Sequence, residues 1–135
     1  MAKISAITKQ EKYKVEIHSL TGNSLIADEP VEMGGMNMGF SPKELLASSL
    51  AACTSITLKM YAAHKAWDLK EVKVDIALDF YAGENKTVIN RKIDLTGDLD
   101  EAQKRRLLAV ANACPVHKML TNPVEISTII TDLKL

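Results

Sequence analysis

Residues 41–67 read SPKELLASSLAACTSITLKMYAAHKAW and predict one long helix. Ser41 can serve as the N-cap, Pro42 suits the first helical position, and Glu44 can complete a capping box. The stretch then continues to Trp67 without glycine or proline, and it is apolar on nearly every face, with its charges concentrated near the ends. A helix of this kind is typically buried in the centre of a protein.

Short strands are predicted on both sides of this helix. Residues 12–18, KYKVEIH, and residues 71–80, EVKVDIALDF, alternate apolar and polar side chains, which is typical of half-buried strands. The full set of predicted strands covers residues 12–18, 24–28, 71–80, 86–97 and 124–135. A Gly-rich loop leads into the long helix, and a second helix over residues 99–113 is opened by Asp98 with Glu101.

The order of these elements predicts an α+β fold with antiparallel sheets packed on a long central helix. The connection AGEN at residues 82–85 is too short for a parallel crossover, so the strands beside it pair antiparallel. We expect a single domain over residues 1–135. One chain of this length can hardly cover so apolar a helix on all sides, so a symmetric homodimer packed around it is expected.

The composition excludes several classes of partner. Lysines plus arginines number 17 and acidic residues number 17, which leaves no electrostatic footprint for nucleic acid or for a membrane surface. No uncharged apolar run reaches the roughly 18 residues of a bilayer span. We expect a cytoplasmic protein, whose two cysteines stay as thiols or cycle catalytically because that compartment is reducing.

The first cysteine motif is NACPVHKML at residues 112–120. Pro115 disfavours helix at Cys114 and suits the first position of a new helix, so Cys114 is predicted to cap a short segment that runs to about Thr121. Free N–H groups at a helix start stabilise a thiolate, and a protonated His117 would add to this. Equally, Cys114 could be only a small residue that caps a kinked pair of helices, with no reactive role.

The second cysteine, Cys53, lies in the middle of the long helix. Its face carries Leu46, Leu50, Ile56 and Met60, with the hydroxyls of Ser49 and Thr57 nearby. Taken alone, this pattern is more typical of an inert core cysteine.

The two motifs together resemble the OsmC/Ohr superfamily, named for an osmotically inducible protein and for organic hydroperoxide resistance. The similar features are the Gly-rich approach, the Pro-x-Glu-Leu helix start at Pro42, Ala-Ala-Cys at Cys53 and Cys-Pro-Val-His at Cys114. The order of elements agrees over essentially the whole chain, in the manner of the OsmC-like branch.

The resemblance implies an OsmC-like fold, an intertwined homodimer and two active sites at the subunit interface. It also implies a peroxidase in which Cys53 attacks an organic hydroperoxide and Cys114 resolves the product, with an external thiol as reductant. No cofactor or metal is expected. The apolar surroundings of Cys53 would suit a fatty or aromatic hydroperoxide.

The sequence departs from the best-known enzymes of this family at two places. Those enzymes carry an arginine in the N-terminal strands, whereas the first arginine here is Arg91. They carry a glutamate directly after the proline of the helix start, whereas Lys43 stands there and Glu44 follows. Glu44 is therefore a candidate catalytic residue or only a helix cap, and nine helical residues turn it about 180° away from Cys53. We expect the short helix and His117 to act on Cys114, which leaves Cys53 less activated.

Two other functions are compatible with these residues. A non-catalytic dimer could bind an apolar or electrophilic small molecule at its interface. Met33, Met36 and Met38 could, with a thiol, form a soft-metal site, although methionines also fill gaps at interfaces.

Overall fold

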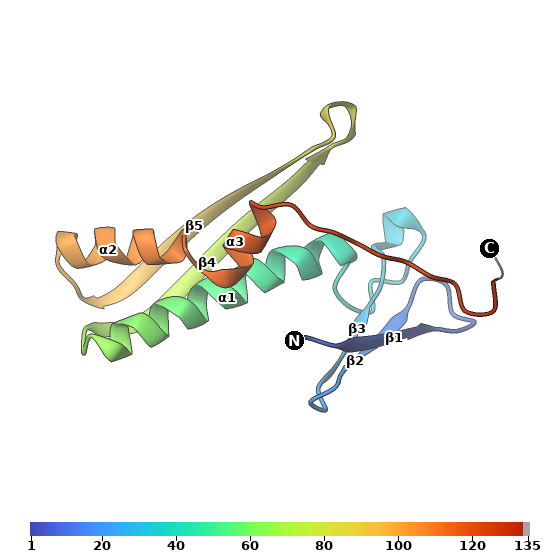
Figure 1. Ribbon diagram of the computed structural model, residues 1–135, viewed down its shortest axis with the longest axis horizontal. Coiled ribbons are helices and arrows are strands. Elements are labelled where there is room, and N and C mark those ends of the chain that lie inside the picture. The colour runs from blue at the N-terminus through green and yellow to red at the C-terminus, as the bar shows by residue number, and fades with distance from the viewer. Residues whose placement is uncertain (134–135) are drawn as a thin grey trace. The chain divides into compact units, whose positions relative to one another are not determined.

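A computed structural model gives the structure and describes residues 1–133, which form an α+β fold (Figure 1). The elements are β1 (Ile4–Thr8), β2 (Val15–Ser19), β3 (Ser24–Ala27), η1 (Val31–Met33), α1 (Pro42–His64), β4 (Asp68–Tyr81), η2 (Ala82–Glu84), β5 (Lys86–Asp98), α2 (Glu101–Ala111) and α3 (Pro115–Leu120). The α+β class and the antiparallel sheets predicted from the sequence are confirmed.

The chain divides into two compact units. Unit 1 contains Met1–Ser49 and Ile76–Arg91, and unit 2 contains Leu50–Asp75 and the chain from Lys92 onward. The single domain over residues 1–135 stays a prediction. Each unit is described by itself below.

Unit 1 contains a three-stranded antiparallel sheet in the order β1-β2-β3. Strand β2 pairs with β1 through Val15↔Thr8 and with β3 through Val15↔Ala27. The predicted strand over residues 12–18 begins later than expected, because Tyr13 has a left-handed backbone with φ of 68°. The alternating N-terminal residues also form a strand, β1, which was not predicted.

The loop after β3 is organised by a buried carboxylate. Asp28 is only 2% exposed and accepts hydrogen bonds from the backbone N–H groups of Glu29 at 2.8 Å, Met36 at 3.2 Å and Met38 at 3.0 Å. These bonds, that of Met38 foremost, lower the pKa of Asp28 against the opposing effect of burial. The ionised carboxylate therefore fixes the path of the loop.

Two glycines of this loop are required by close backbone approaches. A side chain at Gly35 would collide with the Glu29 carbonyl and the Asp28 carboxylate, and one at Gly39 would collide with the Ile26 carbonyl. Residues 35 and 39 therefore pack against the end of β3 in a way that only glycine allows.

Helix α1 begins with the predicted capping box. The Ser41 N–H donates to the Glu44 carboxylate at 3.0 Å, and the Glu44 N–H donates to the Ser41 hydroxyl at 3.3 Å. The helix ends at His64, earlier than Trp67, because Ala66 adopts a left-handed conformation with φ of 57°.

Within the chain, only one narrow face of α1 is buried. Its buried residues are Leu50, Thr54, Leu58 and Ala62, each four residues after the last. By length and composition α1 could cross a membrane, but a core helix of a soluble protein meets the same test. The all-round burial that its sequence predicts is not provided by the residues of one described chain, since Ile56 and Met60 are 58% and 68% exposed.

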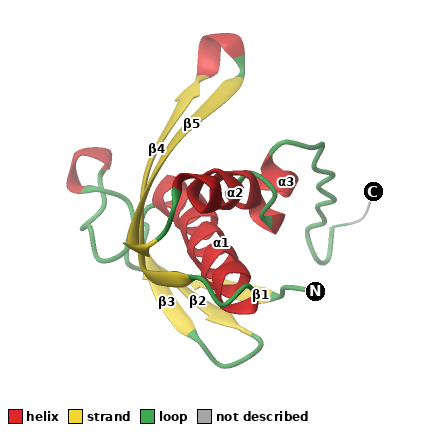
Figure 2. Ribbon diagram, turned by 90° about the vertical axis from the view of Figure 1, so that its left-hand side faces the viewer, coloured by secondary structure: helices red, strands yellow, loops and turns green. Residues whose placement is uncertain are grey.

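The core of unit 2 lies between α1, α2 and the unit-2 parts of the β4–β5 hairpin (Figure 2). Its fully buried members include Leu58 on α1 and Leu107 and Ala111 on α2. The N-cap of α2 is Asp100, whose carboxylate accepts from the Gln103 N–H at 2.7 Å, and not Asp98 as the sequence suggested.

The strand predicted over residues 124–135 is not formed in its described part. Residues 124–130 have no regular secondary structure, residues 131–133 lie in or beside a turn, and residues 134–135 lie outside the described residues. Val124, Ile126, Ile129 and Ile130 of this segment are all exposed. The prediction is wrong for 124–133 because a strand needs a partner, and the described part of this chain supplies none there.

Candidate thiol site

Both cysteines belong to unit 2, and neither forms a disulfide. Cys53 lies on α1 and is half-buried, whereas Cys114 is fully buried. Cys114 is the N-cap of α3 with an extended backbone, and Pro115 occupies the first helical position. The local prediction for NACPVHKML is therefore confirmed.

A hydrogen bond joins the α3 segment to the long helix. The backbone N–H of Val116 donates to the Sγ atom of Cys53 at 3.4 Å. Because Val116 follows Cys114 by two residues, this bond brings the two cysteine motifs, 61 residues apart in the sequence, into one site. The contact of the Val116 N–H group with Cys53 was not predicted, and the expected action of the helix start and of His117 on Cys114 stays a prediction.

A hydroxyl is a second polar neighbour of the same sulfur. The Thr57 Oγ1 atom, one helical turn after Cys53, is 4.0 Å from Sγ. Side chains on a helix lean toward its N-terminus, so Thr57 is directed back toward position 53. The Cys53 sulfur therefore has two neutral polar neighbours.

Cys114 continues the buried face of α2. Leu107, Ala111 and Cys114 are spaced by four and three residues, and all three have no exposed surface. The Cys114 thiol is therefore shielded from solvent, while the half-buried Cys53 is the more accessible of the two.

Glu44 belongs to unit 1, where its carboxylate accepts from the Ser41 N–H. This bond, followed by one with the Ser41 hydroxyl, lowers the pKa of Glu44 and favours the ionised carboxylate. The capping alternative thus has direct contacts in its support, and a catalytic role for Glu44 stays a prediction.

Lys104, Arg105 and Arg106 form a basic cluster on α2, and Arg106 contacts an aromatic side chain of α1 within unit 2. Arg106 Nε donates to the Tyr61 hydroxyl at 2.8 Å, and its guanidinium carbon lies 5.4 Å from the centre of the Tyr61 ring. Lys65 lies 5.8 Å from the same ring centre, and Trp67 packs edge-on against it. Arg106 is therefore engaged with an aromatic pair at the end of α1.

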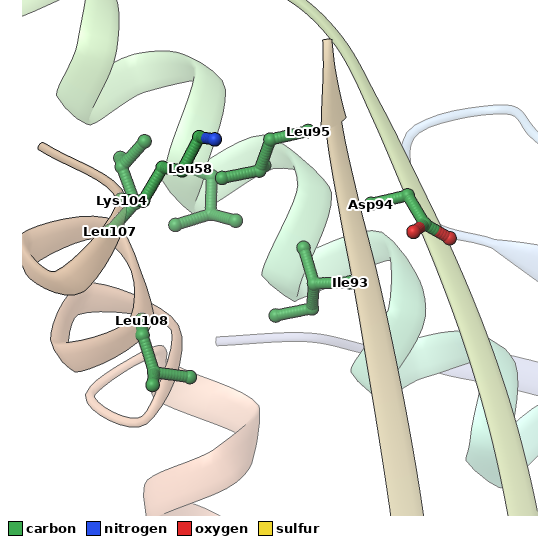
Figure 3. Close-up of a pocket in the computed structure, with 7 residues that line it drawn as sticks. All are labelled: Leu58, Ile93, Asp94, Leu95, Lys104, Leu107 and Leu108. Atoms are coloured by element: carbon green, nitrogen blue, oxygen red, sulfur yellow. The ribbon is translucent and has the colours of Figure 1, made fainter. Parts of the chain in front are cut away.

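A cavity of about 350 Å³ lies in unit 2 between α2, β5 and α1 (Figure 3). Ile93 and Leu95 of β5 point toward α2, whereas the Asp94 carboxylate points to the opposite side of the strand. The remaining lining residues are Leu58, Lys104, Leu107 and Leu108. The cavity is thus mainly apolar, and neither cysteine lines it.

Metal binding gains no support from side-chain clustering. Within residues 1–133 there is no group of three or more His, Cys, Asp or Glu side chains that could hold a metal ion. Met33, Met36 and Met38 of the proposed soft-metal site are all exposed on the loop that Asp28 organises.

Sequence reasoning missed two features of these regions. The Val116 contact comes from the backbone, so no residue type signals it. The anchoring role of Asp28 had a signal, because a short carboxylate at a strand end before a Gly-rich loop is well suited to bind successive backbone N–H groups.

The family model described as OsmC-like protein matches residues 34–129. Among solved structures, the chain is similar to a protein of Psychrobacter arcticus provisionally described as osmotic-stress-induced and involved in the detoxification response. The two share 26% identity with a TM-score of 0.75, over 87% of this chain and 85% of that one. No curated protein matches the chain at the sequence level.

Two further structures are similar in fold. The OsmC-like protein of Mycoplasma pneumoniae is 21% identical with a TM-score of 0.76, over 89% of this chain and 86% of that one. The organic hydroperoxide resistance protein OhrB of Bacillus subtilis is 22% identical with a TM-score of 0.62, over 90% of each chain.

Proposed function

The chain belongs to the OsmC-like protein family, and from this premise we propose that it is a thiol-dependent peroxidase that reduces organic hydroperoxides. Cys53 is the thiol that reacts with the peroxide, and Cys114 is the thiol that resolves the product. The similarity to structures described as detoxification and hydroperoxide resistance proteins supports this substrate class.

The observation that carries the proposal is the 3.4 Å hydrogen bond from the Val116 N–H to the Cys53 sulfur. Consecutive Cα atoms are about 3.8 Å apart, so Cys114 lies within a short distance of the same sulfur. A disulfide needs Cα atoms within about 7 Å of each other, and the Val116 contact supports such an approach of the two cysteines. The same bond stabilises negative charge on Cys53.

The reaction proceeds in three steps. The Cys53 thiolate attacks the terminal oxygen of the hydroperoxide, so that an S–O bond forms, the O–O bond breaks and the alkoxide takes a proton to leave as an alcohol. The Cys114 sulfur then attacks Cys53 sulfenic acid, which forms the disulfide and releases water. Two equivalents of an external thiol, or one dithiol, finally reduce this disulfide through a mixed disulfide, so that both cysteines are restored and the reductant leaves as its own disulfide.

The active protein in this proposal is a cytoplasmic homodimer. The exposed apolar residues of α1, Ile56 and Met60, support burial against a second copy of the chain. The exposed apolar segment 124–133 supports pairing with the same partner. Each thiol site would then lie at the subunit interface, and neither nucleic acid nor a membrane takes part.

The proposal is tested by trapping the first oxidation product. A Cys114→Ser variant is mixed with cumene hydroperoxide and a dimedone probe, and mass spectrometry locates the label. In the variant we expect sulfenic acid on Cys53 and one alcohol formed per Cys53 oxidised. The wild-type chain should instead form one alcohol per Cys53–Cys114 disulfide. A label on Cys114 alone, in a Cys53→Ser variant, would reverse the two roles, and no oxidation of either cysteine would exclude a peroxidase.

A second candidate function is binding of a small apolar molecule without catalysis. It is favoured by the cavity beside Leu107 and Leu108, whose volume of about 350 Å³ is at the lower end of ligand sites. A Leu95→Trp variant would fill this cavity. If calorimetry shows an apolar ligand bound to the wild type but not to this variant, and no cysteine reacts with peroxide, this second function holds.

A further inference from the structure

We propose that Thr57 is a positioning residue for the reactive thiol, and that its hydroxyl acts together with the Val116 N–H to stabilise the Cys53 thiolate. This inference rests on the proposed role of Cys53. It goes beyond that role because it names the groups that stabilise the thiolate.

The orientation of Thr57 differs from that of its neighbours on α1. The hydroxyl groups of Thr54 and Ser55 donate to backbone carbonyls one turn earlier, at 2.7 Å and 2.9 Å. This arrangement is common for hydroxyl side chains inside helices. The Thr57 hydroxyl instead lies toward the Cys53 sulfur, at 4.0 Å.

The two polar neighbours of the sulfur have complementary properties. The Val116 N–H is fixed by the backbone at 3.4 Å, whereas the Thr57 hydroxyl can rotate and approach as negative charge develops. A thiolate attracts such donors more strongly than a neutral thiol does. Thr57 therefore contributes most when Cys53 is ionised, which is the state that attacks a peroxide.

Other ionisable groups on α1 and α3 could also change the rate of Cys53 alkylation with pH. Segment α3 and its cap carry Cys114, His117 and Lys118, and α1 carries Lys59 six residues after Cys53. Lys59 is engaged elsewhere, because its ammonium donates to the Leu69 carbonyl at 2.8 Å. The test must therefore separate a hydroxyl effect from a general change in charge or packing.

Two substitutions make this separation. Thr57→Val keeps the shape of the side chain and removes the hydroxyl, whereas Thr57→Ser keeps the hydroxyl and removes the methyl group. Alkylation of Cys53 by iodoacetamide is followed from pH 5 to 10 by mass spectrometry of its peptide, without peroxide. Ser55→Ala is the matched control, since it removes a hydroxyl of the same helix that bonds a carbonyl.

We expect Thr57→Val to slow Cys53 alkylation at pH 7 roughly 3- to 10-fold, the equivalent of one hydrogen bond of ordinary strength, and to move the profile to higher pH. Thr57→Ser should retain the wild-type profile, as should Ser55→Ala. If Val behaves as wild type while Ser is impaired, Thr57 acts through packing and the inference is overturned. Equal profiles for all variants would overturn it as well.

The same experiment separates this inference from the proposed function. If cumene hydroperoxide oxidises the wild type and Thr57→Val alkylates normally, the peroxidase stands and the role of Thr57 fails. If Thr57→Val shifts the profile but no variant reacts with peroxide, the role of Thr57 in thiolate stabilisation stands and the peroxidase fails.

Discussion

The backbone N–H of Val116 lies 3.4 Å from the sulfur of Cys53 and donates to it. A main-chain group from α3 thus contacts a thiol in the middle of α1, across 63 residues of sequence. The contact is neutral and directional, so it favours the thiolate without supplying a full positive charge. This difference from an arginine-based site leads to the first prediction.

Peroxide reduction should become faster as pH rises. A thiolate, and not a thiol, attacks a peroxide, and a neutral donor does not supply the positive charge of a guanidinium. Stopped-flow oxidation of the reduced protein by cumene hydroperoxide between pH 5 and 9 measures this. A fast rate that does not change with pH would reveal a charged partner already holding the thiolate.

The protein should sediment as a dimer of about twice 14.8 kDa at micromolar concentration. Ile56 lies on the exposed apolar face of α1, so Ile56→Glu should place a charge in the interface and shift the protein toward monomer. Arg105→Glu, an exposed change on α2, is the control and should leave the dimer intact. A stable monomer in the wild type would contradict the interface and any site shared across it.

The fold of unit 1 should lose stability in acid because of Asp28. Its pKa is lowered in the folded chain by the N–H groups of Met38, Glu29 and Met36. The stabilisation is therefore fully present above the unfolded value of about 3.9, and it is lost as pH falls through the lower folded value. Urea unfolding from pH 7 to pH 3 should show this loss in the wild type.

Asp28→Asn should be less stable than the wild type at pH 7 and should lack part of the acid-dependent loss. The exposed Asp75→Asn serves as the control, because its carboxylate only approaches Lys73 at the surface. Equal pH dependence in all three proteins would show that the carboxylate of Asp28 does not anchor the loop.

Helix α2 should depend on its N-cap. Asp100→Ala removes the 2.7 Å bond from the Gln103 N–H and should lower the free energy of unfolding by about 0.5–2 kcal/mol. Asp98→Ala should stay within about 0.5 kcal/mol of the wild type, because Asp98 is not the cap. Thermal unfolding of the three proteins decides between the two aspartates.

The sequence was sufficient where local chemistry decides the structure. Ser41, Pro42 and Glu44 predicted the start of α1, and Pro115 predicted both the break at Cys114 and the start of α3, since capping and proline effects act within one turn. The alternation of apolar and polar residues from Val72 onward predicted β4, because the two-residue period of a strand is also a local signal.

Sequence reasoning was insufficient where distant segments meet. The prediction of a strand after Pro123 failed for the described residues because alternating apolar residues do not specify a partner strand. The helix start at Cys114 was predicted, but the group it would contact was not, since that depends on how α3 packs against α1. Thr57 was recognised on the face of Cys53, whereas its orientation toward the sulfur required coordinates.

The two compact units are interleaved along the chain. The boundaries between them fall after Ser49 in α1, after Asp75 in β4 and after Arg91 in β5, so each one interrupts a regular element. A gene fragment that stops at any of these positions would encode a severed helix or strand. Neither unit is encoded by one continuous gene segment, so neither can be exchanged, duplicated or expressed without the other.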